Sequence, residues 1–127
     1  MSRDFNKNKV AVLTGAAKKI GKSTAIKLAE QGFNILIHTG GKSIEEAKDT
    51  IKLLEKFKIK SNYVTGDLAN LETINIIKDA ALKLGTPSVL VNNAGLRIHE
   101  HFEKIDYKDW KKVMTVNVDA SFLCAQA

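Results

Sequence analysis

The segment from Thr14 to Gly21 has the residue types of a phosphate-binding loop. A short apolar run, Val10 to Leu13, precedes it, and a helical pattern follows it. A buried strand that turns through a glycine-bearing loop into a helix directs backbone N–H groups at an anion. The positive end of the helix dipole adds to that field. We therefore expect a phosphate-bearing ligand at this loop.

Two kinds of phosphate loop compete for these residues. The P-loop of nucleoside triphosphatases has four residues between its glycines, whereas five residues separate Gly15 from Gly21. The extra residue displaces Lys22 from the β- and γ-phosphates, and no clear magnesium-binding aspartate closes a second strand. The spacing therefore favours a dinucleotide loop.

Strand and helix patterns alternate along the whole chain. Strands are expected at 9–13, 33–37, 61–65 and 89–91, and helices at 20–31, 43–57, 71–84 and from Asp106 onward. The first helix has apolar residues at helical spacing, at Ile20, Ala25, Leu28 and Ala29. Ser43, with Glu46 three residues later, predicts a capping box at the start of the second helix.

This alternation predicts βαβ units with right-handed crossovers and a parallel sheet. The expected fold class is α/β: a doubly wound Rossmann sheet with helices on both faces, truncated after the fourth strand and its following helix. Ligands of such sheets bind at the carboxyl ends of the strands. The unusual loop residues fall at those ends, in the Gly15 loop, 38–42, 66–67 and 92–95.

The composition is that of one soluble globular domain. The chain has 127 residues, of which 44% are hydrophobic and 27% charged, which is enough for one core. No apolar run is long enough to span a bilayer, and Met1 to Asp4 lacks the apolar core of a signal peptide. The single cysteine, Cys124, favours a reducing compartment, and we expect a cytoplasmic protein.

The net charge of +6 raises nucleic acid as a partner. However, the lysines are spread along the chain and interleaved with acids, as in 44–49, and no basic tract carries interleaved aromatic residues. A solvated lysine-rich surface explains the charge better than specific nucleic-acid binding.

Four short motifs follow one another at characteristic distances. They are Thr14-Gly15-x-x-x-Lys19-x-Gly21, Gly66-Asp67-Leu68, Asn92-Asn93-Ala94-Gly95 and Val116-Asn117-Val118. Together they resemble the short-chain dehydrogenase/reductase family, over nearly all of the chain. The resemblance implies a nicotinamide dinucleotide cofactor and hydride transfer between it and a small carbonyl or alcohol. It also implies that residues 1–127 form the cofactor-binding first half of such an enzyme.

One departure from the family pattern is informative. The family's usual middle glycine is Lys19 here, and the run Thr-Gly-Ala-Ala-Lys-Lys-Ile-Gly is similar to the pteridine reductase branch. A lysine there adds a cation beside the cofactor phosphates. The alternative is a lysine that points into water.

The end of the second strand predicts the cofactor. NAD enzymes place an acid there for the adenosine ribose hydroxyl, but no acid occurs here before Glu45. Lys42 and Ser43 can instead bind a 2′-phosphate, so NADP(H) is expected. His38 either contacts the cofactor or is a polar strand-end residue.

The resemblance assigns further roles. Asp67 accepts a hydrogen bond from the adenine amino group, with Leu68 packed nearby, and 93–95 pass under the adenosine ribose. The complete set of expected cofactor-binding residues is Thr14, Gly15, Ala17, Lys18, Lys19, Ile20, Gly21, His38, Lys42, Ser43, Asp67, Leu68, Asn93, Ala94 and Gly95. No metal ligands are expected.

One residue of the family's catalytic set is present. Asn117 matches the asparagine that kinks the helix and holds a water in a proton relay, while the family's Ser and Tyr-x-x-x-Lys lie beyond the last residue given. Tyr107 and Lys111 match Tyr-x-x-x-Lys literally, but they precede Asn117, where the family has the start of a surface helix. We expect residues 1–127 alone to be inactive.

The substrate stays open at this point between a 3-oxoacyl thioester, a pteridine, a sugar and a steroid-like ketone. Lys19 favours pteridine-like chemistry, and 92–97 equally resemble 3-oxoacyl reductases. The resemblance implies a homodimer or homotetramer formed through the last helix. The alternatives are a non-catalytic NADP-binding module and a basic nucleic-acid-binding protein.

Overall fold

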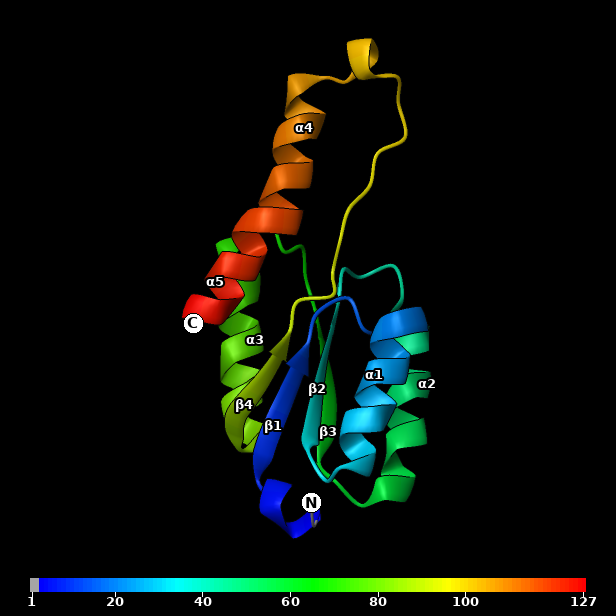
Figure 1. Cartoon of the computed structure of the whole chain (residues 1–127), viewed down its shortest axis with the longest axis vertical. Coiled ribbons are helices and arrows are strands. Elements are labelled where there is room, and N and C mark those ends of the chain that lie inside the picture. The colour runs from blue at the N-terminus through cyan, green and yellow to red at the C-terminus, as the bar shows by residue number, and fades with distance from the viewer. Residues whose placement is uncertain (1–2) are drawn as a thin grey trace.

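The computed structural model describes residues 3–127 and shows one parallel sheet between two layers of helices (Figure 1). The strands lie in the order β3-β2-β1-β4. Their bounds are β1 Lys9–Leu13, β2 Asn34–Thr39, β3 Ser61–Thr65 and β4 Thr86–Val91. All three strand pairs are parallel. The doubly wound α/β fold predicted from the alternation of patterns is confirmed.

Five α-helices connect and follow these strands. They are α1 Lys19–Glu30, α2 Ile44–Leu54, α3 Leu71–Leu84, α4 Tyr107–Met114 and α5 Ala120–Gln126. Short 3₁₀ turns occupy Arg3–Asn6, Glu55–Phe57 and Phe102–Lys104, and a π-helical turn, Thr115–Asp119, joins α4 to α5. Within residues 3–127, no helix has the length and apolarity needed to cross a membrane.

The side chains of β1 and β2 alternate between two cores, because successive strand residues face opposite sides of a sheet. Leu13, Ile35 and Ile37 pack on one side, against the buried faces of α1 and α2. Val12 and Leu36 pack on the other side, against α3 and α5. Both central strands are therefore covered on both faces, as a doubly wound sheet requires.

Two strands differ in extent from the sequence prediction. β2 continues through Thr39, so His38 is a buried strand residue rather than a loop residue. β4 begins at Thr86 instead of Val89, and its register against β1 shifts between Val10 and Ala11. Pro87 lies in this irregular part, which is consistent with the lack of a backbone donor in proline.

The predicted capping box at Ser43 is wrong. Ser43 does stand at the N-cap of α2, but its side chain makes no capping hydrogen bond. Side-chain caps occur instead on two other helices, where Asn70 accepts from Glu72 N and Asp106 accepts from Lys108 N. Ile20 also departs from the buried face of α1, since 76% of its surface is exposed.

The chain after β4 leaves the layered core. It runs as an extended segment beyond the carboxyl ends of the strands, and α4 then leads back so that α5 lies beside α3 (Figure 1). This path places α4 above the edge of the sheet at which the loops after the strands meet.

Candidate functional site

Thr14 joins the loops that follow β1 and β4. Its hydroxyl oxygen accepts hydrogen bonds from the backbone N–H groups of Asn93, at 3.2 Å, and Ala94, at 3.1 Å. Its own N–H donates to Val91 O at 3.1 Å. Thr14 is buried. It therefore holds the two loops together from below rather than facing a ligand.

The glycines of the first loop allow a closer approach than any side chain would. A Cβ at Gly15 would lie 2.7 Å from Ala94 Cα, and a Cβ at Gly21 would lie 2.5 Å from Ala16 Cα. The Asn93 amide closes the contact by donating to Gly15 O at 2.9 Å. Substitution at Gly15, which also has a left-handed φ of 59°, would push the two loops apart, and substitution at Gly21 would push the start of α1 away from Ala16 and Asn93.

Lys19 adopts a left-handed backbone conformation, with φ of 54°. This conformation is disfavoured for residues with a Cβ and is common for glycine. A lysine there stores strain at the first residue of α1, and such strain is concentrated at functional sites. The sequence predicted a cation beside a phosphate at Lys19, and the backbone shows why a glycine would be the unstrained choice.

The N-terminus of α1 offers backbone donors to a ligand. Its N-cap, Lys18, makes no side-chain capping bond, and the first N–H groups of any helix have no partner within it. Ala17, just before, is buried, and its carbonyl accepts from the Thr50 hydroxyl at 2.8 Å. The loop is thus supported from α2, while the first amides of α1 have no partner within the helix.

His38 lies below the same loop, at the carboxyl end of β2. Its Nδ1 accepts from the Gly15 N–H at 3.3 Å, and its Nε2 lies 2.8 Å from Gly66 O. Burial lowers the pKa of His38, opposed by the hydrogen bond to Gly66 and the charge of Asp67. The imidazole is therefore neutral near pH 7, with both nitrogens bonded to backbone.

The loops after the four strands, together with α4, line a solvent-open cavity of about 660 Å³ at the carboxyl edge of the sheet. Four lysines line it: Lys18 and Lys19 from the first loop, Lys42 from the loop after β2, and Lys112 from α4. Asp67 is the one carboxylate among the described residues that line it. The surplus of positive charge suits an anionic ligand.

Most of the predicted cofactor-binding residues meet at this cavity. Those that line it are Gly15, Lys18, Lys19, Ile20, His38, Lys42, Ser43, Asp67, Leu68, Asn93, Ala94 and Gly95. The other three, Thr14, Ala17 and Gly21, lie directly behind it, in the contacts described above. The predicted residues converge on one place, while the role of each in binding stays a prediction.

The sequence analysis placed Thr39 and Gly40 at this edge of the sheet without a binding role, and it missed Leu96, Lys112 and Val116 as lining residues. Lys112 and Val116 are four residues apart, so they share one helical face. The sequence alone shows that spacing. It does not show that this helical face lies over the cavity, because that position depends on the long segment between β4 and α4.

Asn117 lies in the π-helical turn between α4 and α5. Its side chain forms a paired contact with Leu96, accepting from Leu96 N at 2.6 Å and donating to Leu96 O at 2.9 Å. Asn117 thus fixes the segment just after Gly95. The π turn stands where a kink was expected, and the proton-relay role stays a prediction.

The literal Tyr-x-x-x-Lys match is not at the cavity. Tyr107 is the first residue of α4 and is 73% exposed, and neither it nor Lys111 lines the cavity. The sequence analysis assigned Tyr107 and Lys111 to a surface helix rather than to a catalytic pair, and their positions agree with that assignment. His99 and His101 are likewise exposed on the preceding segment.

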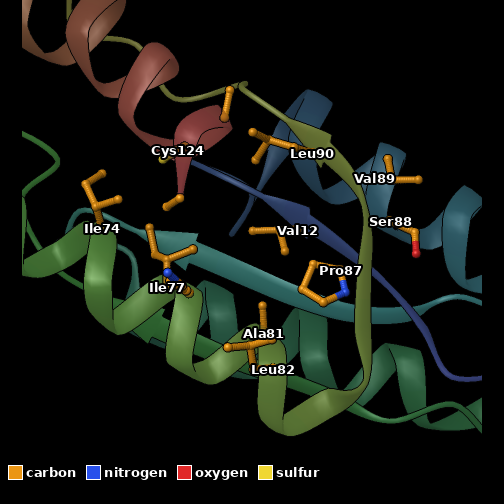
Figure 2. A pocket seen from close by; sticks show the side chains of 13 residues that line it. Val12, Ile74, Ile77, Ala81, Leu82, Pro87, Ser88, Val89, Leu90 and Cys124 are labelled. Atoms are coloured by element: carbon orange, nitrogen blue, oxygen red, sulfur yellow. The ribbon is translucent and has the colours of Figure 1, made fainter.

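A second cavity, of about 370 Å³, lies on the α3 side of the sheet. Its lining is mostly aliphatic, with Ile74 and Ile77 of α3 facing Leu90 of β4 and Cys124 of α5 (Figure 2). Lys78 is the one charged residue in this lining among those described. It lacks the polar groups needed to hold a phosphate-bearing ligand.

Comparison with known proteins decides between the possible families. The family model for short chain dehydrogenases matches residues 9–127. The chain belongs to this family. The family predicted from the sequence motifs is thus confirmed, and membership implies a nicotinamide cofactor and oxidoreductase chemistry.

Individual relatives show the same likeness. An uncharacterized oxidoreductase, YohF, of Escherichia coli is 39% identical over 92% of this chain and 46% of its own length. The L-2,3-butanediol dehydrogenase of Corynebacterium glutamicum is 38% identical, with 94% and 47% covered. A 3-oxoacyl-[acyl-carrier-protein] reductase of Staphylococcus epidermidis is 34% identical, with 94% and 49% covered.

Solved structures agree with the sequence relatives. The crystal structure of an acetoin dehydrogenase from Salmonella typhimurium matches with a TM-score of 0.87 and 36% identity, over 94% of this chain and 47% of that one. The chain spans about half the length of the relatives it matches.

We predict that Lys19→Gly raises the free energy of unfolding by about 1 kcal/mol, because glycine accepts the left-handed backbone. The same change should weaken binding of a nicotinamide dinucleotide, since it removes a cation from the cavity. Chemical denaturation and cofactor titration measure the two effects. Lys22→Gly, inside α1, is the control and should lower stability by about 1 kcal/mol. A loss of stability in Lys19→Gly would refute the strain at this position.

Proposed function

We propose that this chain is the NADP-binding Rossmann half, residues 1–127, of a short-chain reductase or dehydrogenase. The whole protein would transfer hydride between NADP(H) and a small carbonyl or alcohol. The observation that carries the proposal is the cavity at the carboxyl edge of the sheet. Among the described residues, four lysines and one carboxylate line this cavity, so its lining has an excess of positive charge. A cytoplasmic location, which the single Cys124 favours, belongs to the same proposal.

The preference for NADP(H) rests on the residues after β2. Gly40 leaves open space, because a Cβ there would meet no atom within 4 Å. Lys42 and Ser43 follow it and line the cavity. A carboxylate at this place would repel a 2′-phosphate, whereas a lysine and a hydroxyl group attract one.

The chain's own residues would bind and orient the dinucleotide. The open amides at the start of α1 and the side chains of Lys18 and Lys19 would hold the phosphates. Asp67 and Leu68 would contact the adenine, and Asn93 to Gly95 would lie along its ribose. The bound nicotinamide carries the hydride, and the protein contributes position and electrostatics.

Asn117 is the one proposed catalytic residue in this chain. Its paired bonds to Leu96 fix the backbone beside Gly95 at the rim of the cavity. The groups that exchange a proton with the substrate would come from the Ser and Tyr-x-x-x-Lys of the family pattern. Residues 118–127 contain neither tyrosine nor lysine, so Tyr-x-x-x-Lys does not occur among them. We therefore expect residues 1–127 by themselves to bind cofactor without turnover.

Several substrate classes remain in this proposal. The relatives include an acetoin dehydrogenase, a butanediol dehydrogenase and a 3-oxoacyl reductase. Their names favour short hydroxyketones and 3-oxoacyl thioesters as the substrate classes. Lys19 supports pteridines as a third class, through the likeness of its loop to the pteridine reductase branch.

Turnover by the complete gene product tests the function. A panel of hydroxyketones, 3-oxoacyl thioesters and pteridines is supplied with NADPH or NADH, and cofactor oxidation is followed by absorbance. We expect oxidation of NADPH with at least one class. Binding of NADPH without any turnover would favour the non-catalytic module, and turnover with NADH alone would overturn the cofactor assignment.

The role of Lys42 has its own test. Lys42→Asp should weaken NADPH binding by about 1–3 kcal/mol, roughly 5- to 150-fold, with a smaller effect on NADH. Dissociation constants for both cofactors measure the difference. Lys52→Asp, an equal charge reversal at an exposed site of α2 outside the cavity lining, is the control. Equal weakening of NADPH and NADH would show that Lys42 does not contact the 2′-phosphate.

The proposal includes a homodimer or homotetramer that forms through α4 and α5. Large apolar side chains on α4 and α5 are exposed, with Trp110 at 51% and Phe122 at 63%. Exposed apolar groups gathered on one segment are typical of an association surface.

Sedimentation of the complete gene product tests this interface. We expect a dimer or tetramer, and Trp110→Glu with Phe122→Glu should shift it to smaller species, because both charges would lose their hydration on association. Phe5→Glu, at an exposed phenylalanine near the N-terminus and outside α4 and α5, should leave the mass of the assembly unchanged. A monomeric parent protein would refute the interface.

A further inference from the structure

His38 is the residue through which three strand ends are tied together. Besides the two ring contacts, its own carbonyl accepts from Ala16 N at 3.0 Å. Two consecutive amides of the phosphate loop, those of Gly15 and Ala16, are therefore both bonded to His38. The loop after β3 is bonded to the opposite side of the ring, at Gly66 O.

The partners of the ring determine which nitrogen carries the proton. Gly66 O can only accept, so Nε2 must be the donor, and Gly15 N–H can only donate, so Nδ1 must be bare. A second proton would set the Nδ1–H against the Gly15 N–H. His38 is 2% exposed, so little water is available to replace the lost bond.

Charged groups from several elements line the cavity that His38 also lines. Asp67, after β3, favours a charged ring. The lysines of this lining are Lys18 and Lys19 of the first loop, Lys42 after β2, and Lys112 of α4. Desolvation is the largest effect and favours the neutral form, so the pKa of His38 lies below its ordinary value.

We propose that neutral His38 is a positioning residue for the dinucleotide, and that a proton on its ring releases Gly15 and weakens cofactor binding. The inference deepens the proposed function and rests on it. His38 does not contact the reacting atoms. It fixes the peptide of Gly15, and with it the direction in which the following loop amides point.

The sign of the pH dependence follows from the lowered pKa. A group that is neutral in the folded protein and easier to protonate in the unfolded chain stabilises the fold at high pH. That contribution is lost as the pH falls through the folded pKa of His38. Cofactor affinity should fall below the folded pKa of His38, approaching tenfold per pH unit.

Two variants separate the two sides of the ring. His38→Asn keeps an acceptor near the place of Nδ1 for Gly15, and His38→Gln keeps a donor near the place of Nε2 for Gly66. Neither titrates. Dissociation constants for NADPH are measured for the complete gene product between about pH 5 and about pH 8, the range in which histidine titrates.

We expect the parent affinity to fall as the pH is lowered, and both variants to lose that fall. His38→Asn, which keeps the bond to Gly15, should bind NADPH more tightly at neutral pH than His38→Gln. His101→Gln, at an exposed histidine, should keep the parent profile. A parent profile without the fall, or the parent profile retained in His38→Asn and His38→Gln, would overturn the inference.

NMR of the imidazole supplies a readout without cofactor. Nitrogen shifts should show the Nε2–H tautomer, with a pKa below that of free histidine. An Nδ1–H tautomer or an ordinary pKa would overturn the inference even where NADPH binds. Absence of NADPH binding by the parent at every pH would instead refute the proposed function, and the tautomer would still report on His38.

Discussion

The loops after β1 and β4 lie in direct backbone contact, and the position of every other group at the carboxyl edge depends on that contact. The Thr14 hydroxyl accepts two N–H groups from the β4 loop, and the absence of a Cβ at Gly15 admits Ala94. Gly21 also packs closely, on Ala16 and on Asn93, so the same group of contacts determines where α1 begins. The cavity is therefore shaped by close main-chain contacts and by the side chains of Thr14 and Asn93 that bind them, while the lysines around it supply charge.

Few carboxylates stand near that charge. Among the described residues, two ion pairs join neighbours within single helices, Lys27 with Glu30 and Lys48 with Glu45. The cavity lysines are outside both pairs. A site with several uncompensated cations favours an anion over water. The buried neutral ring of His38 adds rigidity below these cations without adding a charge.

Local patterns were sufficient for the order of strands and helices, since apolar runs and helical spacing are properties of neighbouring residues. The short-chain family could be identified because its motifs sit at the strand ends that the fold brings together. Ser43 shows the limit: its type and spacing fit a cap, but its backbone, with φ of −121° and ψ of 39°, leaves its hydroxyl unbonded to the helix. The left-handed Lys19, the ring contacts of His38 and the place of Lys112 depend on tertiary approach. No spacing in the sequence encodes them.

The π-helical turn at Thr115–Asp119 amounts to one residue more than a regular helix would contain. A π turn takes up that residue within one wide turn, so the helices on either side need not rotate about their axes. α5 therefore keeps its packing on α3, and α4 keeps Lys112 at the cavity, while the turn between them holds Asn117 against Leu96.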